Sequence, residues 1–429
     1  MLRPYEEKSQ GSSYFLWEFV IVITLFCSFG FPGNMEDQLG GMFSTGAKYL
    51  PFLMQLTIML LASGQSYEDI KLLDLQKRYI PVYCLLVLFF VVSMLVTSQP
   101  KEQFISCIRF SVTALFALWM SERYDVDKML EFCYYALMLF VLATIAYTVL
   151  FPGTAFSNES GERSFVGLYL SKNACGTQMS FGIILQMVWY KVLSWKNKPV
   201  PRHFVVLLIA QAVFLLMANT SGALLCILVP LGYVFVMGGT KEDAVRLPLG
   251  FVHVVASVGF LLFALTIIPL FQPFFELIGK DATLTGRIPI WRQLIDVMTY
   301  HNTMTGFGYS MFWKDHVAVT LFHAGFEKSS YGNTMTFGAH NALIEFWLDV
   351  GLLGVTAYIF MMIVSFSSHR IARLSREQYA LCSAVILWLT CKGILERMYF
   401  PFCYPTLFLF FCIGLALNAP AGTQGRQNV

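Results

Sequence analysis

One polar stretch of the sequence holds the side chains best suited to proton transfer and to phosphate binding. It runs from Gln272 to Asn341, in a chain that is 57% hydrophobic and 13% charged, and it contains four of the seven histidines. His340 and Asn341 end this stretch, and an apolar run begins directly after them. A neutral imidazole, with an ordinary pKa of about 6.5, accepts a proton from a hydroxyl group at physiological pH. We therefore take His340 as the candidate general base.

Two carboxylates follow His340 along the chain. If a helix begins after Asn341, Glu345 and Asp349 lie one and two turns further on. Ionisable groups at the edge of lipid are costly, which favours a functional role. The alternative is that His340 and Asn341 only cap the helix and satisfy its free amide groups. The other histidines of the stretch are widely spaced, so no metal site is expected.

Basic side chains on the same side of the predicted membrane are suited to a phosphorylated, sugar-bearing lipid. Arg163 and Lys172 lie in SNESGERSFVGLYLSKNACG, and Arg287 and Arg292 lie in TLTGRIPIWRQL. A guanidinium group binds a phosphate through two parallel hydrogen bonds, and such contacts strengthen near lipid. The alternative interpretation is that these residues are solvated loop charges or anchors for lipid headgroups.

Trp291, Tyr309 and Arg109 are three further candidates. The sequence allows two interpretations for Trp291 and two for Arg109. The segment IPIWRQLIDVM places Trp291 on the apolar face of an amphipathic helix at the membrane surface, where its indole stacks on a sugar or packs against lipid. The two glycines of TGFGYS are expected to form a tight turn that brings the backbone close to a ligand or another helix, beside Tyr309. Arg109 lies within a predicted span, so it pairs with a group such as Glu131 or lines the path of the lipid phosphate.

Apolar helices must position these side chains. A bilayer core of about 30 Å needs helices of about 20 apolar residues, and the sequence contains about twelve such runs. We predict an all-α, polytopic transmembrane helical bundle, a single domain over residues 1–429, with a long outer loop over residues 272–341 between the ninth and tenth spans. Short amphipathic helices are expected in that loop. The predicted spans are Tyr14–Phe31, Ala47–Ala62, Tyr79–Thr97, Phe104–Met120, Met129–Phe151, Ala174–Leu193, Phe204–Met217, Gly222–Met237, Leu249–Phe271, Ala342–Ser367, Tyr379–Leu395 and Phe402–Leu417.

Charge distribution predicts the orientation of the chain. Lys and Arg are concentrated in alternate connecting segments, which favours a cytoplasmic location for those segments. With an even number of spans, both termini are then cytoplasmic and the long loop is periplasmic. The first apolar run lacks the cleavage site of a signal peptide and is interpreted as a retained span. The net charge is only +3, so no nucleic-acid partner is expected, and the ten cysteines show no metal-binding or disulfide spacing.

Four motifs in a fixed order carry a family resemblance. They are GLYLSKNACG, TLTGRIPIW, TGFGYSMFW and GAHNALIEFWLDVGLLG, and they extend over about the C-terminal two-thirds of the chain. Together they resemble the O-antigen ligase and polymerase superfamily, in particular its exopolysaccharide-polymerase branch. The resemblance implies an inverting glycosyltransferase of the bacterial inner membrane. Its donor would be an undecaprenyl-diphosphate-linked glycan, and no nucleotide sugar, metal or other cofactor would be needed.

The resemblance also implies roles for the residues that match the motifs. His340 is implied to be the general base or the group that orients the acceptor, and Arg287 to be the arginine that holds the diphosphate. Arg163, Lys172 and Asn173 are implied to form an earlier outer site. The full set expected to bind substrate is Arg163, Lys172, Asn173, Trp291, Arg292, Tyr309, Asn341, Glu345 and Arg109.

The chain departs from the family pattern at two positions. Gly338 stands where the family often has a histidine, which weakens any mechanism with two histidines. Ser171 also replaces a frequent histidine, which removes a partner from the earlier outer site.

We expect the protein to polymerise lipid-linked repeat units into a surface polysaccharide, which would be O-antigen, capsule or exopolysaccharide. A glycan acceptor, the lipid bilayer, a flippase and a chain-length regulator are the expected partners. A ligase that moves finished glycan to a lipid A core or another acceptor fits the same motifs. A flippase or secondary transporter also fits about twelve spans, although such proteins usually show two related halves and charges at the membrane midplane.

Overall fold

The helical bundle predicted from the apolar runs is present in a computed structural model of the chain. The structure describes residues 11–29, 41–65, 79–157, 163–169, 171–239, 246–273, 284, 286–325, 338–396 and 404–419. Within these ranges, a helix overlaps each predicted span. These helices are α1 Gly11–Ser28, α3 Gly41–Gln65, α5 Ile80–Val96, α6 Pro100–Arg123, α7 Val126–Leu150, α8 Lys172–Trp195, α9 Phe204–Met217, α10 Ser221–Gly239, α11 Leu249–Thr266, α15 Ala342–Ser365, α17 Arg376–Leu395 and α18 Tyr404–Asn418.

Five of these helices are long and apolar enough to cross a membrane by length and composition. Among the described residues, they are α6, α7, α11, α15 and α17. The number of twelve crossings therefore stays a prediction. The predicted location of both termini concerns residues 1–10 and 420–429, which lie outside the described residues.

The all-α prediction holds for the bundle, with one small addition. Strands β1 Phe156–Ser157 and β2 Ser164–Phe165 pair antiparallel, with Phe156 opposite Phe165, in the connection between α7 and α8. A short helix, α16 Ser368–Ile371, connects α15 to α17.

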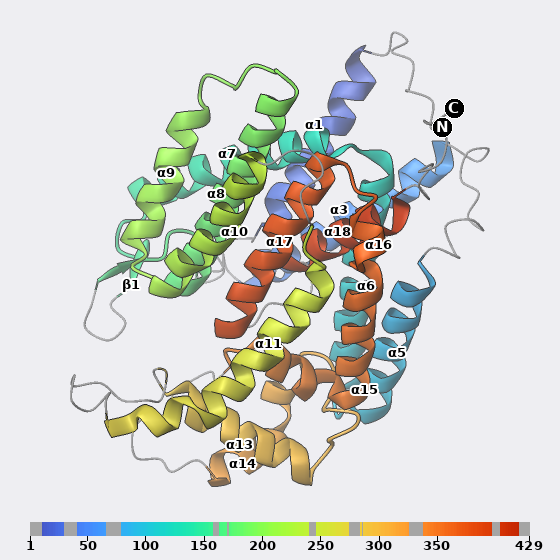
Figure 1. Cartoon of the computed structure of the whole chain (residues 1–429), viewed down its shortest axis with the longest axis vertical. Helices are drawn as coiled ribbons and strands as arrows, with labels where there is room; N and C mark the ends of the chain where they lie inside the picture. Colours follow the sequence, from blue (N-terminus) through green and yellow to red (C-terminus); the bar gives the residue numbers. More distant parts are fainter. Residues whose placement is uncertain are drawn as a thin grey trace.

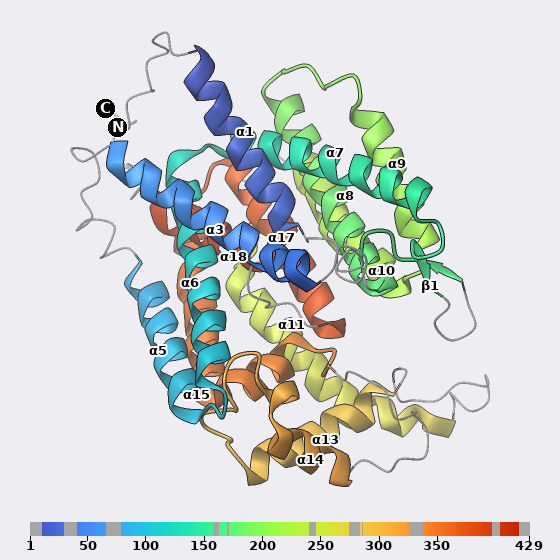
Figure 2. The same ribbon diagram turned by 180° about the vertical axis from the view of Figure 1, so that it is seen from behind.

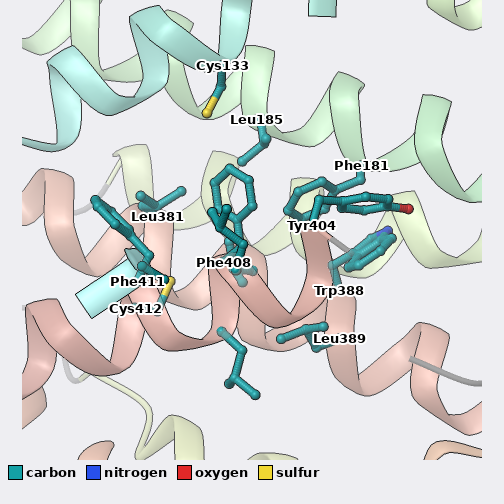
Figure 3. Packing of buried hydrophobic residues seen from close by; sticks show 14 of the residues in the cluster. Cys133, Phe181, Leu185, Leu381, Trp388, Leu389, Tyr404, Phe408, Phe411 and Cys412 are labelled. Atoms are coloured by element: carbon teal, nitrogen blue, oxygen red, sulfur yellow. The ribbon is translucent and has the colours of Figure 1, made fainter. Parts of the chain in front are cut away.

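Helix α17 lies at the centre of the bundle, between the group α7 to α10 and the group α5, α6, α15 and α18 (Figure 1). Its first turn has a capping box, in which the Ser375 hydroxyl accepts from the Gln378 amide and the Gln378 side chain accepts from the Ser375 amide. Figure 3 shows the aromatic packing of its middle, where the Trp388 and Phe181 ring centroids lie 4.4 Å apart. The Trp388 indole donates to the Ser180 hydroxyl at 3.2 Å. The one polar atom of the Trp388 ring thus has a partner across helices, which limits the cost of a polar group in lipid.

The segment between α11 and α15 folds over one end of the bundle, as both views show (Figures 1 and 2). It contains η3 Ile268–Phe271, α13 Arg287–Tyr300, η4 Phe312–Lys314 and α14 His316–Gly325. The predicted loop 272–341 is therefore described in part, because residues 274–283, 285 and 326–337 lie outside the described ranges. Its described part contains the amphipathic helices that the sequence predicted.

This segment has a hydrophobic core of its own, which we call the cap core. In it the apolar face of α13 packs with the end of α11, with α14 and with the first half of α15. Its members include Trp291, Leu294, Phe312, Phe322 and Leu348. We call the segment between α11 and α15 the cap. It also contacts the turn between α5 and α6, where the Ser98 hydroxyl donates to Asp315, and the first turn of α6, where Lys314 pairs with Glu102 at 2.7 Å. The cap is thus held on two sides of the bundle.

Helix α15 is broken at Gly351, which has φ +64° and ψ −171°. The break frees backbone groups on both sides of Gly351, and residues 303–308 satisfy them. The amides of Phe307 and Gly308 donate to the carbonyls of Leu348 and Asp349 at 2.8 and 2.9 Å. In return, the amides of residues 352 and 353 donate to the carbonyls of residues 303 and 304 at 3.0 and 3.1 Å. We call this exchange the α15 splice, and it removes the cost of unpaired backbone groups within a membrane helix.

Glycine is required where the two backbones of the splice meet. Gly306 and Gly308 have φ values of +69° and +98°, and a Cβ at Gly306 would lie 2.7 Å from the backbone of Asp349 and Gly351. The expectation that the TGFGYS glycines allow a close backbone approach is therefore confirmed, and the partner is another helix.

We predict that Gly306→Ala destabilises the protein strongly. The positive φ alone costs about 1–3 kcal/mol for a residue with a Cβ, and the backbone contacts add to this. Thermal unfolding of the detergent-solubilised protein measures the loss. Gly259→Ala in α11 is the matched control, since nothing lies within 4 Å of its added Cβ, and it should leave the unfolding temperature unchanged or raised. Equal unfolding temperatures for the two variants would contradict the splice.

Candidate functional site

Four side chains from four separate parts of the chain meet around Glu396. The His340 Nδ1 lies 3.0 Å from Glu396 Oε2, and the Arg287 guanidinium donates to Glu396 Oε1 at 3.4 Å. The Asn173 amide donates to the same Oε1 at 3.4 Å. Lys392 precedes Glu396 by one helical turn and is buried beside it. We call this group, Asn173, Arg287, His340, Lys392 and Glu396, the Glu396 cluster.

Each member of the cluster is placed by the end of a helix. Glu396 is the C-terminal cap residue of α17, and Asn173 lies in the first turn of α8. Arg287 begins α13, directly after Gly286, whose φ of +80° turns the chain into the helix. His340 stands two residues before α15. The bundle and the cap therefore both contribute to one site.

Two hydrogen bonds of Ala339 fix the backbone directly before His340. His340 itself has φ +48°, a left-handed conformation that is costly for a residue with a side chain. The Ala339 amide donates to Glu345 Oε1 at 2.6 Å, and the buried Trp291 indole donates to the Ala339 carbonyl at 2.6 Å. These bonds hold the imidazole outward, with 40% of its side chain exposed.

Asn341 has the capping role that the sequence analysis considered as an alternative. Its side-chain oxygen accepts from the amides of Leu343 and Ile344 at 3.1 Å, which caps α15. Its amide nitrogen donates to the Ile394 carbonyl at 3.2 Å, two residues before Glu396. The cap of α15 thereby ties the His340 segment to the end of α17.

The cluster carries more positive than negative charge. Burial by itself raises the pKa of Glu396, but the hydrogen bond from His340 and the positive charges of Lys392 and Arg287 bring the pKa below its ordinary value. Glu396 is therefore ionised at neutral pH. One carboxylate faces an ammonium, a guanidinium and an imidazole, so a net positive charge remains for an anionic ligand.

Three predicted substrate-binding residues, Trp291, Tyr309 and Glu345, are buried within the protein. Trp291 is fully buried in the cap core, so its ring packs against protein and does not offer a face to a sugar. Tyr309 is fully buried between α5, α6 and α15, with its ring centroid 4.5 Å from that of Phe89. Glu345 is buried as well and accepts from the Trp313 indole at 3.2 Å. Glu345 and Trp291 thus hold the His340 segment in place through their hydrogen bonds to Ala339.

The remaining predicted residues lie outside the cluster. Arg163 is exposed, and its guanidinium carbon lies 4.6 Å from the centre of the Phe156 ring in the β-hairpin. Lys172 is half-buried at the first residue of α8. Arg292 is exposed and donates to the Leu265 carbonyl at 3.2 Å, which fastens α13 to the end of α11.

Arg109 has a different neighbour from Glu131, the example of a partner suggested from the sequence. Its guanidinium carbon lies 3.9 Å from the centre of the Tyr49 ring, whereas Glu131 pairs with Lys128 at 3.1 Å. The cation–π contact with a tyrosine gives the charge a partner between α6 and α3.

Sequence reasoning missed Glu396 and Lys392. Both lie at the end of an apolar span, where the pattern KGILE offers one usable signal, an acidic residue four positions after a basic one at the edge of lipid. Among the described residues, no group of three His, Cys, Asp or Glu side chains is arranged to hold a metal ion.

A cavity lies beside the cluster, between α11, α15 and α17. It is small, and its mainly apolar lining includes Asn341, Phe346, Leu389 and Ile394. His253 also lines it and is bonded to Thr390 and Tyr358 at 2.8 Å each. Because Asn341 and Ile394 adjoin His340 and Glu396 in the chain, the apolar cavity and the cationic cluster are neighbours.

These features define a helical membrane protein whose basic site lies where a folded cap meets the end of a central helix. The family model described as O-Antigen ligase matches residues 203–359, a range that includes Arg287 and His340. The chain is also 26% identical over 226 residues to a protein named "Exopolysaccharide production protein ExoQ" from Rhizobium meliloti (strain 1021). That alignment covers 52% of this chain and 50% of the relative, so the chain spans about half the length of the curated relative it matches. The comparisons confirm the resemblance to the O-antigen ligase and polymerase superfamily.

We predict that Trp291→Phe lowers the stability of the protein by about 1–3 kcal/mol, because it leaves the buried Ala339 carbonyl without its donor. The unfolding temperature in detergent measures this. Trp17→Phe is the control, since it removes a longer indole bond, 3.2 Å to the Tyr124 hydroxyl, at a part-buried position. A loss in Trp291→Phe no larger than in the control would show that the bond does not hold the His340 segment.

Proposed function

We propose that the protein polymerises oligosaccharide repeat units carried on undecaprenyl diphosphate, by inverting glycosyl transfer at the outer face of the bacterial inner membrane. One observation carries this proposal. His340, half exposed, stands beside a cationic cluster and an apolar cavity, within the region that the O-antigen ligase family model matches. A base, an anion site and a site for a lipid chain are what a lipid-diphosphate donor requires.

The reaction follows from these groups. An acceptor hydroxyl loses its proton to His340 while its oxygen attacks the anomeric carbon of the donor sugar from the face opposite the diphosphate. The bond from that carbon to the diphosphate oxygen breaks, and lipid diphosphate leaves with the electron pair. Arg287 and Lys392 stabilise the charge that grows on the leaving group, and proton transfer to His340 contributes about 10²–10⁴-fold.

In this proposal the lipid chain lies along the apolar opening of the small cavity between α11, α15 and α17, beside the cluster. Its lining is mainly aliphatic and aromatic, which suits an isoprenoid chain and not a sugar. In this arrangement the diphosphate lies at the outer end of the cavity, against Arg287. Arg163, directly before β2, and Lys172, at the first residue of α8, contact the more distant phosphate or the acceptor glycan.

We predict that His340→Ala abolishes long polysaccharide chains in cells that depend on this protein. Arg287→Lys should be impaired too, since an ammonium group does not reproduce the two parallel hydrogen bonds of a guanidinium group. Gel separation of extracted glycans measures chain length. His301→Ala, at an exposed position outside the Glu396 cluster, is the control and should retain normal chains. Normal chains in His340→Ala would remove the proposed role of the imidazole.

The second candidate function is ligation, which the description of the matching family model favours. The same gels separate the two activities in a deletion strain. Loss of long chains with retention of single repeats indicates a polymerase, whereas loss of all capped glycan indicates a ligase. Accumulation of donor on the cytoplasmic leaflet would instead indicate a flippase.

We predict opposite accessibility for the two ends of α8. Ala174 is exposed in its first turn, and Arg202 is exposed after its last. Cysteine at position 174 should react with a membrane-impermeant maleimide in cells with a permeabilised outer membrane, and cysteine at position 202 only after the inner membrane is opened. The unsubstituted protein, labelled in parallel, accounts for native cysteines. The reverse pattern would place the Glu396 cluster on the cytoplasmic side.

A further inference from the structure

We propose that Glu396 is the positioning residue for His340, because it fixes the tautomer of the imidazole and aims the free ring nitrogen away from the bundle. This inference rests on the proposed role of His340 as general base. Glu396 lies outside the region that the family model matches and 56 residues after His340 in the chain.

The hydrogen-bond geometry determines which ring nitrogen carries the proton. An ionised carboxylate only accepts hydrogen bonds, so His340 Nδ1, at 3.0 Å from Glu396 Oε2, must be the protonated nitrogen. A neutral imidazole has one N–H, and Nε2 is then left with its lone pair. The His340 side chain is 40% exposed and that of Glu396 is 17% exposed. The basic nitrogen therefore belongs to the accessible end of the ring.

The surroundings of Glu396 keep it in the ionised form that this role needs. Arg287 comes from α13, Lys392 from α17 and Asn173 from α8, and each favours the carboxylate through charge or a hydrogen bond. The thiol of Cys226, on α10, is a further titratable group that faces the cluster. With the permanently charged guanidinium of Arg287 beside it, Glu396 does not take the Nδ1 proton when Nε2 receives a second one.

The arrangement also stabilises the product of proton transfer. Once Nε2 has accepted the hydroxyl proton, the ring carries a positive charge directly beside Glu396. The pair of opposite charges lowers the free energy of that state, and Glu396 itself gains no proton. Glu396 thus orients the base before the reaction and supports its charge afterwards, without touching the substrate.

The test measures His340 directly and requires no donor. Diethyl pyrocarbonate modifies unprotonated imidazole, so the modification rate of His340 against pH, followed by peptide mass spectrometry on the purified full chain, reports its protonation. Glu396→Gln keeps a hydrogen-bond acceptor but removes the charge. We expect the midpoint of the rate profile to fall by about one pH unit in Glu396→Gln, which gives up to roughly tenfold faster modification in the acidic range.

Two controls give each outcome one meaning. Glu396→Asp retains the charge and should restore the midpoint toward that of the unsubstituted chain. His301, exposed and outside the cluster, should show the same profile in every variant, which verifies that the fold is intact. An unchanged His340 midpoint in Glu396→Gln, with His301 also unchanged, overturns the positioning role. If the midpoint shifts but His340→Ala still makes long chains, the positioning role stands and the proposed function fails.

Discussion

A carboxylate at the end of a membrane helix must be compensated, and the structure is organised around the way Glu396 meets this requirement. Its compensating groups come from α8, α13, α17 and the segment before α15. Loss of any one of them leaves a buried charge less well neutralised, which links the folding of the cap to that of the bundle. Because the cations outnumber the carboxylate, the same arrangement leaves a positive site open at the surface.

The cap depends on two kinds of contact that act together. The cap core brings the apolar face of α13 against the first half of α15, which sets the direction of Arg287. The Trp291 indole donates to Ala339 and Glu345 accepts from it, and these two bonds fix the strained backbone of His340. Dispersed apolar burial thus supplies the stability, while a few directional bonds supply the precision that a reactive side chain needs.

The sequence predicted the parts of this arrangement that depend on local pattern. Apolar runs located the helices, and the change from polar to apolar residues located His340 and the Asn341 cap. Glu396 was not predictable in the same way, because its partnership with His340 depends on how α17 and α15 end in space. The break at Gly351 was hidden for a related reason, since the glycine stands between the apolar residues Val350 and Leu352 within a longer apolar run. Trp291 was placed on the apolar helix face, but its ring packs against protein, and not against the sugar or the lipid that the sequence suggested.

The α15 splice makes helix α15 and the segment before it, residues 303–308, share one set of backbone hydrogen bonds. Neither half of that exchange has a complete structure without the other, although they lie more than forty residues apart in sequence. In a chimera that exchanges this segment between related proteins, the backbone hydrogen bonds would therefore not match unless the broken helix is exchanged together with it. A change of substrate specificity in such proteins is then expected to require exchange of the segment together with the membrane helix, and not of surface loops alone.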